Sequence, residues 1–156
     1  MRILIIIMLA LTAVPCSARL GETLDQCVAR YGPALSSFDT WSKGAFGDKS
    51  VTFSKNGYLV VVTFSQNKAV CEFFSKLDKT DLSETEQGAL LDLESKGWHF
   101  EVIPDQQGNI SYLRKDNQVQ GTYLSAGKKL VICTSGYVAA NEQFQKNIQK
   151  TKLNGF

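Results

Sequence analysis

The chain has little of what the common enzyme chemistries need. Its one histidine is His99, its four cysteines include no Cys-x-x-Cys pair, and it has neither a glycine-rich phosphate loop nor a Gly-x-Ser-x-Gly turn. A zinc site would have to be assembled from dispersed residues. Runs of lysine or arginine are missing and the formal net charge is only +2, which argues against nucleic-acid binding. We expect no cofactor, no metal site and no catalytic residue.

Long apolar runs are also missing, except at the N-terminus. Arg2 precedes an apolar run over residues 3–14 that one threonine interrupts, and Pro15 and the small residues Cys-Ser-Ala follow. This order is typical of a secretory signal peptide, residues 1–18, cleaved after Ala18. An uncleaved anchor is one alternative, although the run is shorter than the about 20 residues that span a bilayer. A lipoprotein signal with Cys16 lipidated is another, but Pro15 stands where a small residue is expected.

We therefore expect a secreted or periplasmic protein without a stable membrane span after cleavage. Residues 19–156 suffice for a single domain. The chain is 44% hydrophobic and 21% charged, a balance that supports a packed core and excludes a wholly disordered chain.

After cleavage the chain keeps three cysteines, Cys27, Cys71 and Cys133. An oxidising compartment permits one disulfide among them, and the odd count leaves at least one thiol free or paired between chains. The sequence does not say which two would pair. Each cysteine lies in an apolar stretch, so buried structural thiols are the favoured interpretation.

The first residues after the signal predict a short, capped helix. Thr23 can cap its start, and Gln26, three residues on, completes a capping box. Gly32 and Pro33 end it. One face of this helix is apolar and is predicted to pack on the following strands; it consists of Leu24, Cys27, Val28 and Tyr31.

The run Gly21-x-Thr23-x-x-Gln26-Cys27-x-x-x-Tyr31-Gly32 resembles the opening helix of the SmpA/OmlA outer-membrane assembly lipoproteins. That family belongs to a wider set of small secreted modules that includes the β-lactamase inhibitor proteins. The resemblance covers residues 21–33, and Pro33 follows Gly32 directly, whereas the family's proline comes one residue later. It implies short helices on an antiparallel sheet that binds other proteins. It transfers no functional residue and names no partner.

Beyond the first helix, period-two patterns predict strands, and Asn56-Gly57 predicts a two-residue hairpin turn. A second capping box, Ser83 with Glu86, opens a second helix that ends near Gly97. A C-terminal helix over residues 137–150 could serve packing or a partner. The expected strands cover residues 38–43, 50–55, 58–65, 68–75, 98–102, 110–114, 118–125 and 128–135.

The two halves, residues 19–78 and 79–135, can be superposed in sequence by a shift of 60 residues, which brings their hairpin turns into register. Two tandem helix-plus-meander repeats would explain this, but so would any antiparallel meander with turns at such spacing. In both cases the fold class is α+β, with short helices packed on an antiparallel β-meander.

The aromatic residues supply the candidate contact surface. Trp98, Phe100 and Val102 alternate along one strand and are expected to face the core. Phe38, Trp41 and Phe46 are the candidate protein-contact surface, with packing at the sheet edge as the alternative.

Catalysis by Cys27 and His99 has no support, because a thiol on a buried helix face is deactivated. The expected function is therefore an exported, non-catalytic protein-binding or envelope-associated module whose partner is another envelope or secreted protein. A cysteine-dependent hydrolase or redox enzyme, and a purely structural envelope protein, remain the alternatives.

Overall fold

The computed structural model describes residues 19–40, 46–104 and 109–153. These residues form three α-helices, a single turn of 3-10 helix and one eight-stranded antiparallel sheet, which confirms the α+β class. The helices are α1 (Leu24–Tyr31), α2 (Glu84–Asp92) and α3 (Ser135–Leu153). The strands are β1 (Ser36–Asp39), β2 (Lys49–Lys55), β3 (Tyr58–Ser65), β4 (Lys68–Lys76), β5 (Phe100–Pro104), β6 (Ile110–Arg114), β7 (Val119–Leu124) and β8 (Lys129–Thr134).

The strand order is β1-β2-β3-β4-β8-β7-β6-β5, so each half of the chain forms a four-stranded meander after its helix. The last strands of the two meanders, β4 and β8, pair antiparallel and join them into one sheet. Cys71 stands opposite Cys133 in this pairing, and the two residues form a disulfide. Buried unpaired thiols are therefore the wrong interpretation for two of the three cysteines and the right one for Cys27.

The helix caps and hairpin turns lie where the sequence predicts them. Thr23 and Ser83 are the N-caps of α1 and α2, and both helices have complete capping boxes with Gln26 and Glu86. Asn56 and Gly57 both have positive φ, as the tight β2–β3 turn requires. The β3–β4 turn follows the same rule.

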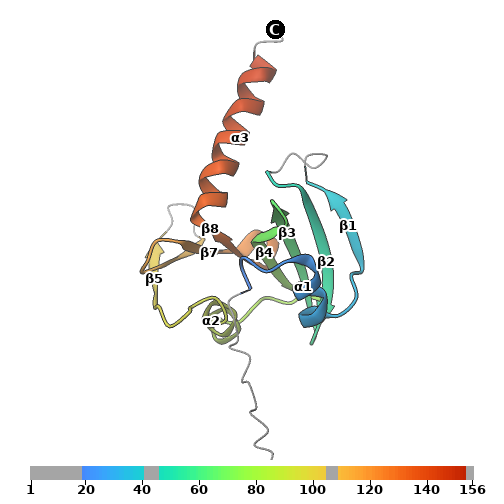
Figure 1. The fold of residues 1–156 in the computed structure, drawn as a ribbon. Helices are drawn as coiled ribbons and strands as arrows, with labels where there is room; N and C mark the ends of the chain where they lie inside the picture. The colour runs from blue at the N-terminus through green and yellow to red at the C-terminus, as the bar shows by residue number, and fades with distance from the viewer. Residues whose placement is uncertain (1–18, 41–45, 105–108, 154–156) are drawn as a thin grey trace, which may run out of the picture.

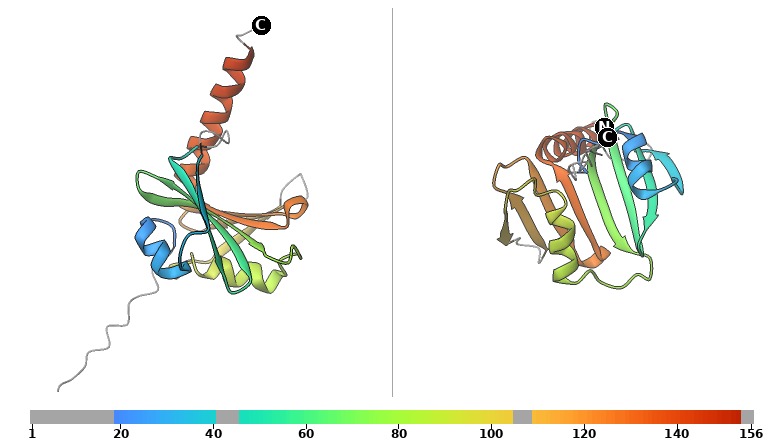
Figure 2. Two further views of the ribbon diagram at one scale, coloured as in Figure 1. Left: turned by 90° about the vertical axis from the view of Figure 1, so that its right-hand side faces the viewer. Right: turned by 60° about the horizontal axis from the view of Figure 1, so that its bottom comes forward.

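The helices α1 and α2 lie on one side of the sheet, here called the inner face (Figure 2, right). The core lies between them and the strands. Tyr31 of α1 packs on Phe53 with ring centroids 5.3 Å apart, and Leu90 and Leu91 of α2 are buried. The sheet contributes most of the large apolar side chains that are fully buried, which are Val51, Phe53, Val60, Val62, Phe64, Phe74, Leu130 and Ile132.

Of the described residues, the beginning of α3 and Phe46 pack on the opposite, outer face, and Figure 1 shows α3 leaving the body. Thr134 Oγ1 accepts a hydrogen bond from the backbone N–H of Tyr137 (3.1 Å), and the Tyr137 ring packs over the disulfide. The rest of α3 extends away from the body, with Lys146 and Lys150 exposed. The helix begins two residues earlier and ends three residues later than predicted.

Several predicted boundaries and buried faces are wrong. Trp98 is 50% exposed and Val102 is 64% exposed. The chain reverses before them, with positive φ at Lys96 and Gly97, and β5 is an edge strand beyond α2. Val28 is 39% exposed because α1 contacts the sheet through Cys27 and Tyr31.

Other boundaries differ as well. The helix α2 ends at Asp92 rather than near Gly97. The first strand covers Ser36–Asp39 rather than residues 38–43, of which residues 41–43 lie outside the described residues. β5 starts at Phe100 rather than at Trp98.

A close approach between α2 and β7 gives a test of the packing. A Cβ atom at Gly121 would stand 2.7 Å from Leu91 Cδ2 and 3.4 Å from Tyr112 Cβ. We expect Gly121→Val to lower the free energy of unfolding by about 1–3 kcal/mol, because the core cannot absorb the added volume. Urea denaturation measures this.

The matched control is Gly88→Ala in α2, where no atom lies within 4 Å of the new Cβ. It should stabilise the protein by up to about 1 kcal/mol through helix propensity. Equal effects of the two substitutions would contradict this placement of α2.

Candidate protein-contact surface

The outer face holds a groove of about 330 Å³ between β1, β3, β4 and the start of α3. Its apolar lining comes from outward-pointing side chains of the meander and from Tyr137. Among the described residues that line it, Lys129 carries the one charge. The lining residues are Phe38, Thr40, Ser50, Leu59, Val61, Thr63, Phe73, Ser75, Lys129 and Tyr137.

The strand register explains why these side chains gather. Val61 pairs with Phe73, and Phe73 pairs with Val131, so one row of apolar side chains crosses three strands on the same face. Phe38 pairs with Ser50, which pairs with Thr63 in the neighbouring row. An amphipathic strand would show polar residues on a face turned to water, whereas this row is aliphatic and aromatic.

The hydroxyl groups at one end of the groove are satisfied within the protein. Ser50 and Thr63 lie 2.8 Å apart, hydroxyl to hydroxyl, and both are buried. Thr40 donates to the backbone oxygen of Gly47. The groove therefore presents mainly van der Waals surface, which suits an apolar ligand group more than a charged one.

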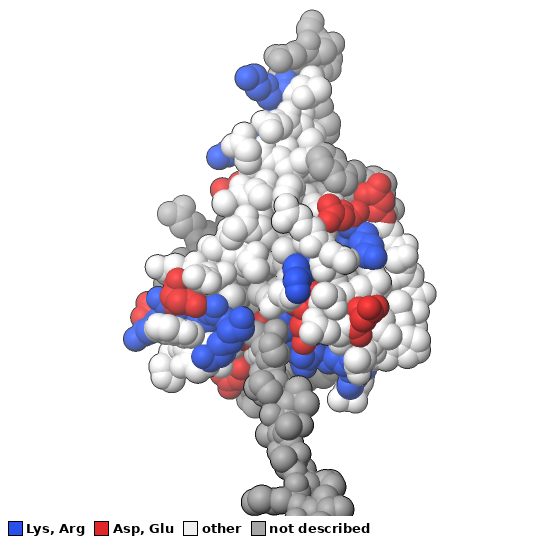
Figure 3. Space-filling model, in the orientation of Figure 1, with Lys and Arg blue, Asp and Glu red and all other residues white. Residues whose placement is uncertain are grey.

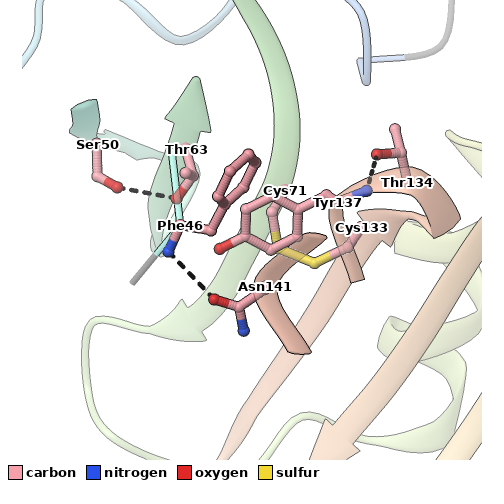
Figure 4. Close-up of a disulfide and its surroundings, with 8 residues drawn as sticks. All are labelled: Phe46, Ser50, Thr63, Cys71, Cys133, Thr134, Tyr137 and Asn141. Carbon is pink, nitrogen blue, oxygen red and sulfur yellow. Dashed lines mark hydrogen bonds between the residues drawn. A yellow bond between two sulfur atoms is a disulfide. The ribbon is translucent and has the colours of Figure 1, made fainter. Parts of the chain in front are cut away.

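Of the three residues predicted to form the contact surface, Phe38 and Phe46 are described and Trp41 lies outside the described residues. Phe38 is 36% exposed at the rim of the groove. Phe46 packs against α3, with its ring centroid 6.0 Å from that of Tyr137 and 6.4 Å from that of Phe144. Its backbone N–H donates to Asn141 Oδ1 at 3.1 Å (Figure 4).

The groove residues contributed by β3 and β4 were not predicted from the sequence. The β-dense run over residues 58–65 indicated a central strand, and a central strand in a sheet covered on one side only must show half of its side chains on the other. The alternation of side chains along this strand was the available signal for the groove. To use it, one has to know which face of the sheet the helices cover.

A second cavity, of about 410 Å³, lies on the inner face between α1 and α2. Several of its ionic groups are already paired, whereas the Nε of Arg19 has no hydrogen-bond partner in the described structure. Arg30 forms an ion pair with Glu22, and Glu86 accepts from Lys76 and from the hydroxyl of Tyr58, both at 2.9 Å. The contacts of Glu86 tie α2 to the strands β3 and β4.

Three carboxylates are buried near the same cavity, those of Glu22, Glu72 and Glu94. Glu72, on the inner face of β4, is 0% exposed, and burial raises its pKa to about 8. Its Oε1 accepts from the hydroxyl of Tyr31 (3.1 Å), while its Oε2 has no hydrogen-bond partner in the described structure. Burial also raises the pKa of Glu94, which accepts two backbone N–H groups.

The residues considered for nucleophilic chemistry are not brought together. Cys27 is 0% exposed, and burial, helped by the nearby carboxylates, raises its pKa to about 12. It lies on α1, which packs on β2, whereas His99 precedes β5 at the far edge of the sheet. No group of three or more histidine, cysteine and acidic side chains in the described part of the chain could hold a metal ion.

Charges of both signs are interspersed over the body in the view of Figure 3, without a broad patch of one sign. Among helices in the described ranges, none combines the length and the apolar content that crossing a bilayer requires. Comparison with family models gives no match for this chain, and comparisons with curated proteins and with solved structures give no significant match.

Proposed function

We propose that this chain is an exported, non-catalytic module that binds another envelope or secreted protein through the outer face of its sheet. The observation that carries the proposal is the apolar groove rimmed by Phe38. The hydroxyl groups of Thr40, Ser50 and Thr63 in it are bonded within the protein, and its described lining has one charge. Half-exposed aliphatic and aromatic side chains on a rigid sheet are typical of the centre of a protein interface. The occupant that fits is an apolar, uncharged protuberance of a partner protein.

Export is supported by two features. The N-terminal run has the layout of a signal peptide cleaved after Ala18. The disulfide between Cys71 and Cys133 favours an oxidising compartment, secreted or periplasmic.

The alternative functions predict different properties of the cysteines and of the groove. A cysteine-dependent hydrolase or redox enzyme needs a reactive thiol, and the burial of Cys27 and the pairing of the other two cysteines weigh against one. A purely structural envelope protein needs no exposed binding groove. Thiol titration separates the first alternative: a thiol that reacts rapidly in the native protein would favour the enzyme.

We also propose that the two halves are tandem repeats. In support, the N-caps Thr23 and Ser83 stand 60 positions apart, and each is followed by one helix and four antiparallel strands. The relation to the SmpA/OmlA lipoproteins remains a proposal that rests on residues 21–33.

The binding proposal is tested by removing apolar surface from the groove. Phe38→Ala and Val61→Ser should each raise the dissociation constant for the purified, identified partner by about tenfold or more, because centrally placed apolar anchors dominate the binding energy. The partner is first captured from an envelope extract and then measured by titration calorimetry with the purified proteins. Trp41→Ala tests the third residue of the predicted surface.

The matched control is Leu77→Ser, a 50% exposed leucine that lies outside the groove. It should leave both partner binding and the melting temperature unchanged. If the groove variants bind as the parent does, the outer face is not the contact surface. If no specific partner is retained by the parent chain, the structural alternative is favoured.

A further inference from the structure

The first described residues are fixed to the body by the backbone. The N–H of Gly21 donates to the backbone oxygen of Ala69 (2.7 Å), and the N–H of Ala69 donates to that of Glu22 (2.8 Å). Leu20 is buried in the core. The predicted cleavage point, between Ala18 and Arg19, therefore directly precedes a segment with a defined position.

The backbone nitrogen of Arg19 meets a buried carboxylate. Glu94 Oε1 accepts its N–H at 2.8 Å, and Glu94 Oε2 accepts the N–H of Leu20 at 3.1 Å. Glu94 is 0% exposed and is held by its own backbone: its oxygen accepts from Arg114 Nη1 (2.6 Å), and its nitrogen donates to Leu91 (2.9 Å). The carboxylate thus has little freedom to turn away.

Few cations lie near this carboxylate, and the guanidinium charge of Arg19 acts on both Glu72 and Glu94. Arg30 pairs with Glu22, and Arg114 forms a two-bonded pair with Asp116. The guanidinium of Arg19 lies over two rings, those of Tyr31 at 5.6 Å and Phe74 at 5.3 Å, and its Nε has no hydrogen-bond partner in the described structure. Glu72 and Glu94 therefore remain as two buried carboxylates that lack an ion pair at hydrogen-bond distance among the described residues.

We propose that Glu94 is the binding site for the α-ammonium of Arg19 that signal-peptide removal creates. The inference rests on the export and the cleavage after Ala18 put forward under the proposed function. Hydrolysis of the Ala18–Arg19 peptide bond consumes one water, leaves a carboxylate on Ala18 in the released peptide, and leaves an ammonium on Arg19. A peptide N–H with one proton to donate becomes a cation with three, at the 2.8 Å position that it already occupies.

The consequence is a fold that becomes more stable on processing. In the precursor Glu94 accepts two neutral N–H groups in a buried site, whereas in the processed chain it gains a buried, charge-assisted partner.

A double-mutant cycle tests the pairing. The chain beginning at Arg19 is compared with the same chain acetylated at its α-amine, each with Glu94 or with Glu94→Gln, by urea denaturation at pH 7. Acetylation should raise the equilibrium constant for unfolding by about tenfold or more in the Glu94 background. It should have little effect with Glu94→Gln. Glu142→Gln, an exposed acid on α3, is the matched control and should leave the acetylation effect intact.

A second measurement does not depend on a variant that folds. In the native chain, an amine-reactive acetylating reagent should modify the Arg19 α-amine at least about tenfold more slowly than in urea, because an ammonium held by a buried carboxylate is not available. Equal rates, or an acetylation penalty that survives Glu94→Gln, would overturn the proposal.

The mass of the exported chain tests the premise separately. A chain that begins at a residue other than Arg19 overturns this inference, while the binding proposal is still decided by the groove variants. If none of those variants loses partner binding, the proposed contact surface is wrong, but the ammonium site is not affected by that result.

Discussion

Replacing Glu72 with glutamine should make the protein more stable above neutral pH and flatten the dependence of its stability on pH. Glu72 is fully buried on β4, and burial raises its pKa from 4.5 to about 8. The native state therefore retains a proton that the unfolded state releases. Its stabilising contribution is complete below pH 4.5 and is lost as the pH rises through about 8.

The effect on stability is large because the pKa values of Glu72 in the unfolded and native states lie far apart. Between the two pKa values each pH unit costs about 1.4 kcal/mol of unfolding free energy, so the loss reaches several kcal/mol at its upper end. Glutamine is neutral at every pH and can still accept from the hydroxyl of Tyr31. Glu94 acts in the same direction, since burial raises its pKa as well, so the flattening should be incomplete.

Urea denaturation at intervals from pH 5 to pH 9 measures the difference between Glu72→Gln and the parent. The control is Glu101→Gln on the exposed edge strand β5, which should leave the slope unchanged. If the curves of Glu72→Gln and the parent run parallel, Glu72 does not titrate in this range. The ammonium proposed at Arg19 stabilises the carboxylate of Glu94 and so opposes the effect of burial on that group. A chain with an acetylated N-terminus should therefore show the steeper dependence of stability on pH.

Removing the disulfide should cost about 2–4 kcal/mol of unfolding free energy, because the bond closes a long loop in the unfolded chain. Cys71 and Cys133 are 62 residues apart in sequence and join β4 to β8, the one pairing between the two halves of the sheet in the described residues. The double variant Cys71→Ala/Cys133→Ala is compared with the oxidised parent by urea denaturation. Reduction of the disulfide in the parent with a thiol reagent should also lower the free energy of unfolding.

The control for this experiment is Cys27→Ala, which keeps the disulfide. It is destabilised by the small cavity, but reduction should cost it as much as it costs the parent. In the chain that begins at Arg19, thiol titration should find one free cysteine, reactive only after denaturation, since Cys27 is fully buried. Three thiols in the oxidised protein, or equal stability before and after reduction, would contradict the pairing.

The candidate site was predictable only in part. Phe38 was predicted as a contact residue, and the structure places it at the rim of the groove. Phe46 instead packs on α3, a contact with a helix about 90 positions away that no local pattern can indicate. Val61 and Phe73 were recognisable as strand residues, but their role depends on which face the helices leave uncovered. Trp98 was expected in the core, but it lies in the turn that precedes the edge strand β5 and is 50% exposed.

The sequence by itself determined the elements whose causes are local. Both capping boxes join residues three apart, and the turn at Asn56-Gly57 depends on the φ angles of its own two residues. Tertiary structure alone decided the pairing of β4 with β8, the choice of Cys71 and Cys133 for the disulfide, and the burial of Glu72 and Glu94. The pairing and the disulfide depend on contacts between residues 56 or more positions apart. The burial of the two carboxylates depends on the assembled core, which excludes water from them. Neither cause can be read from a short window of sequence.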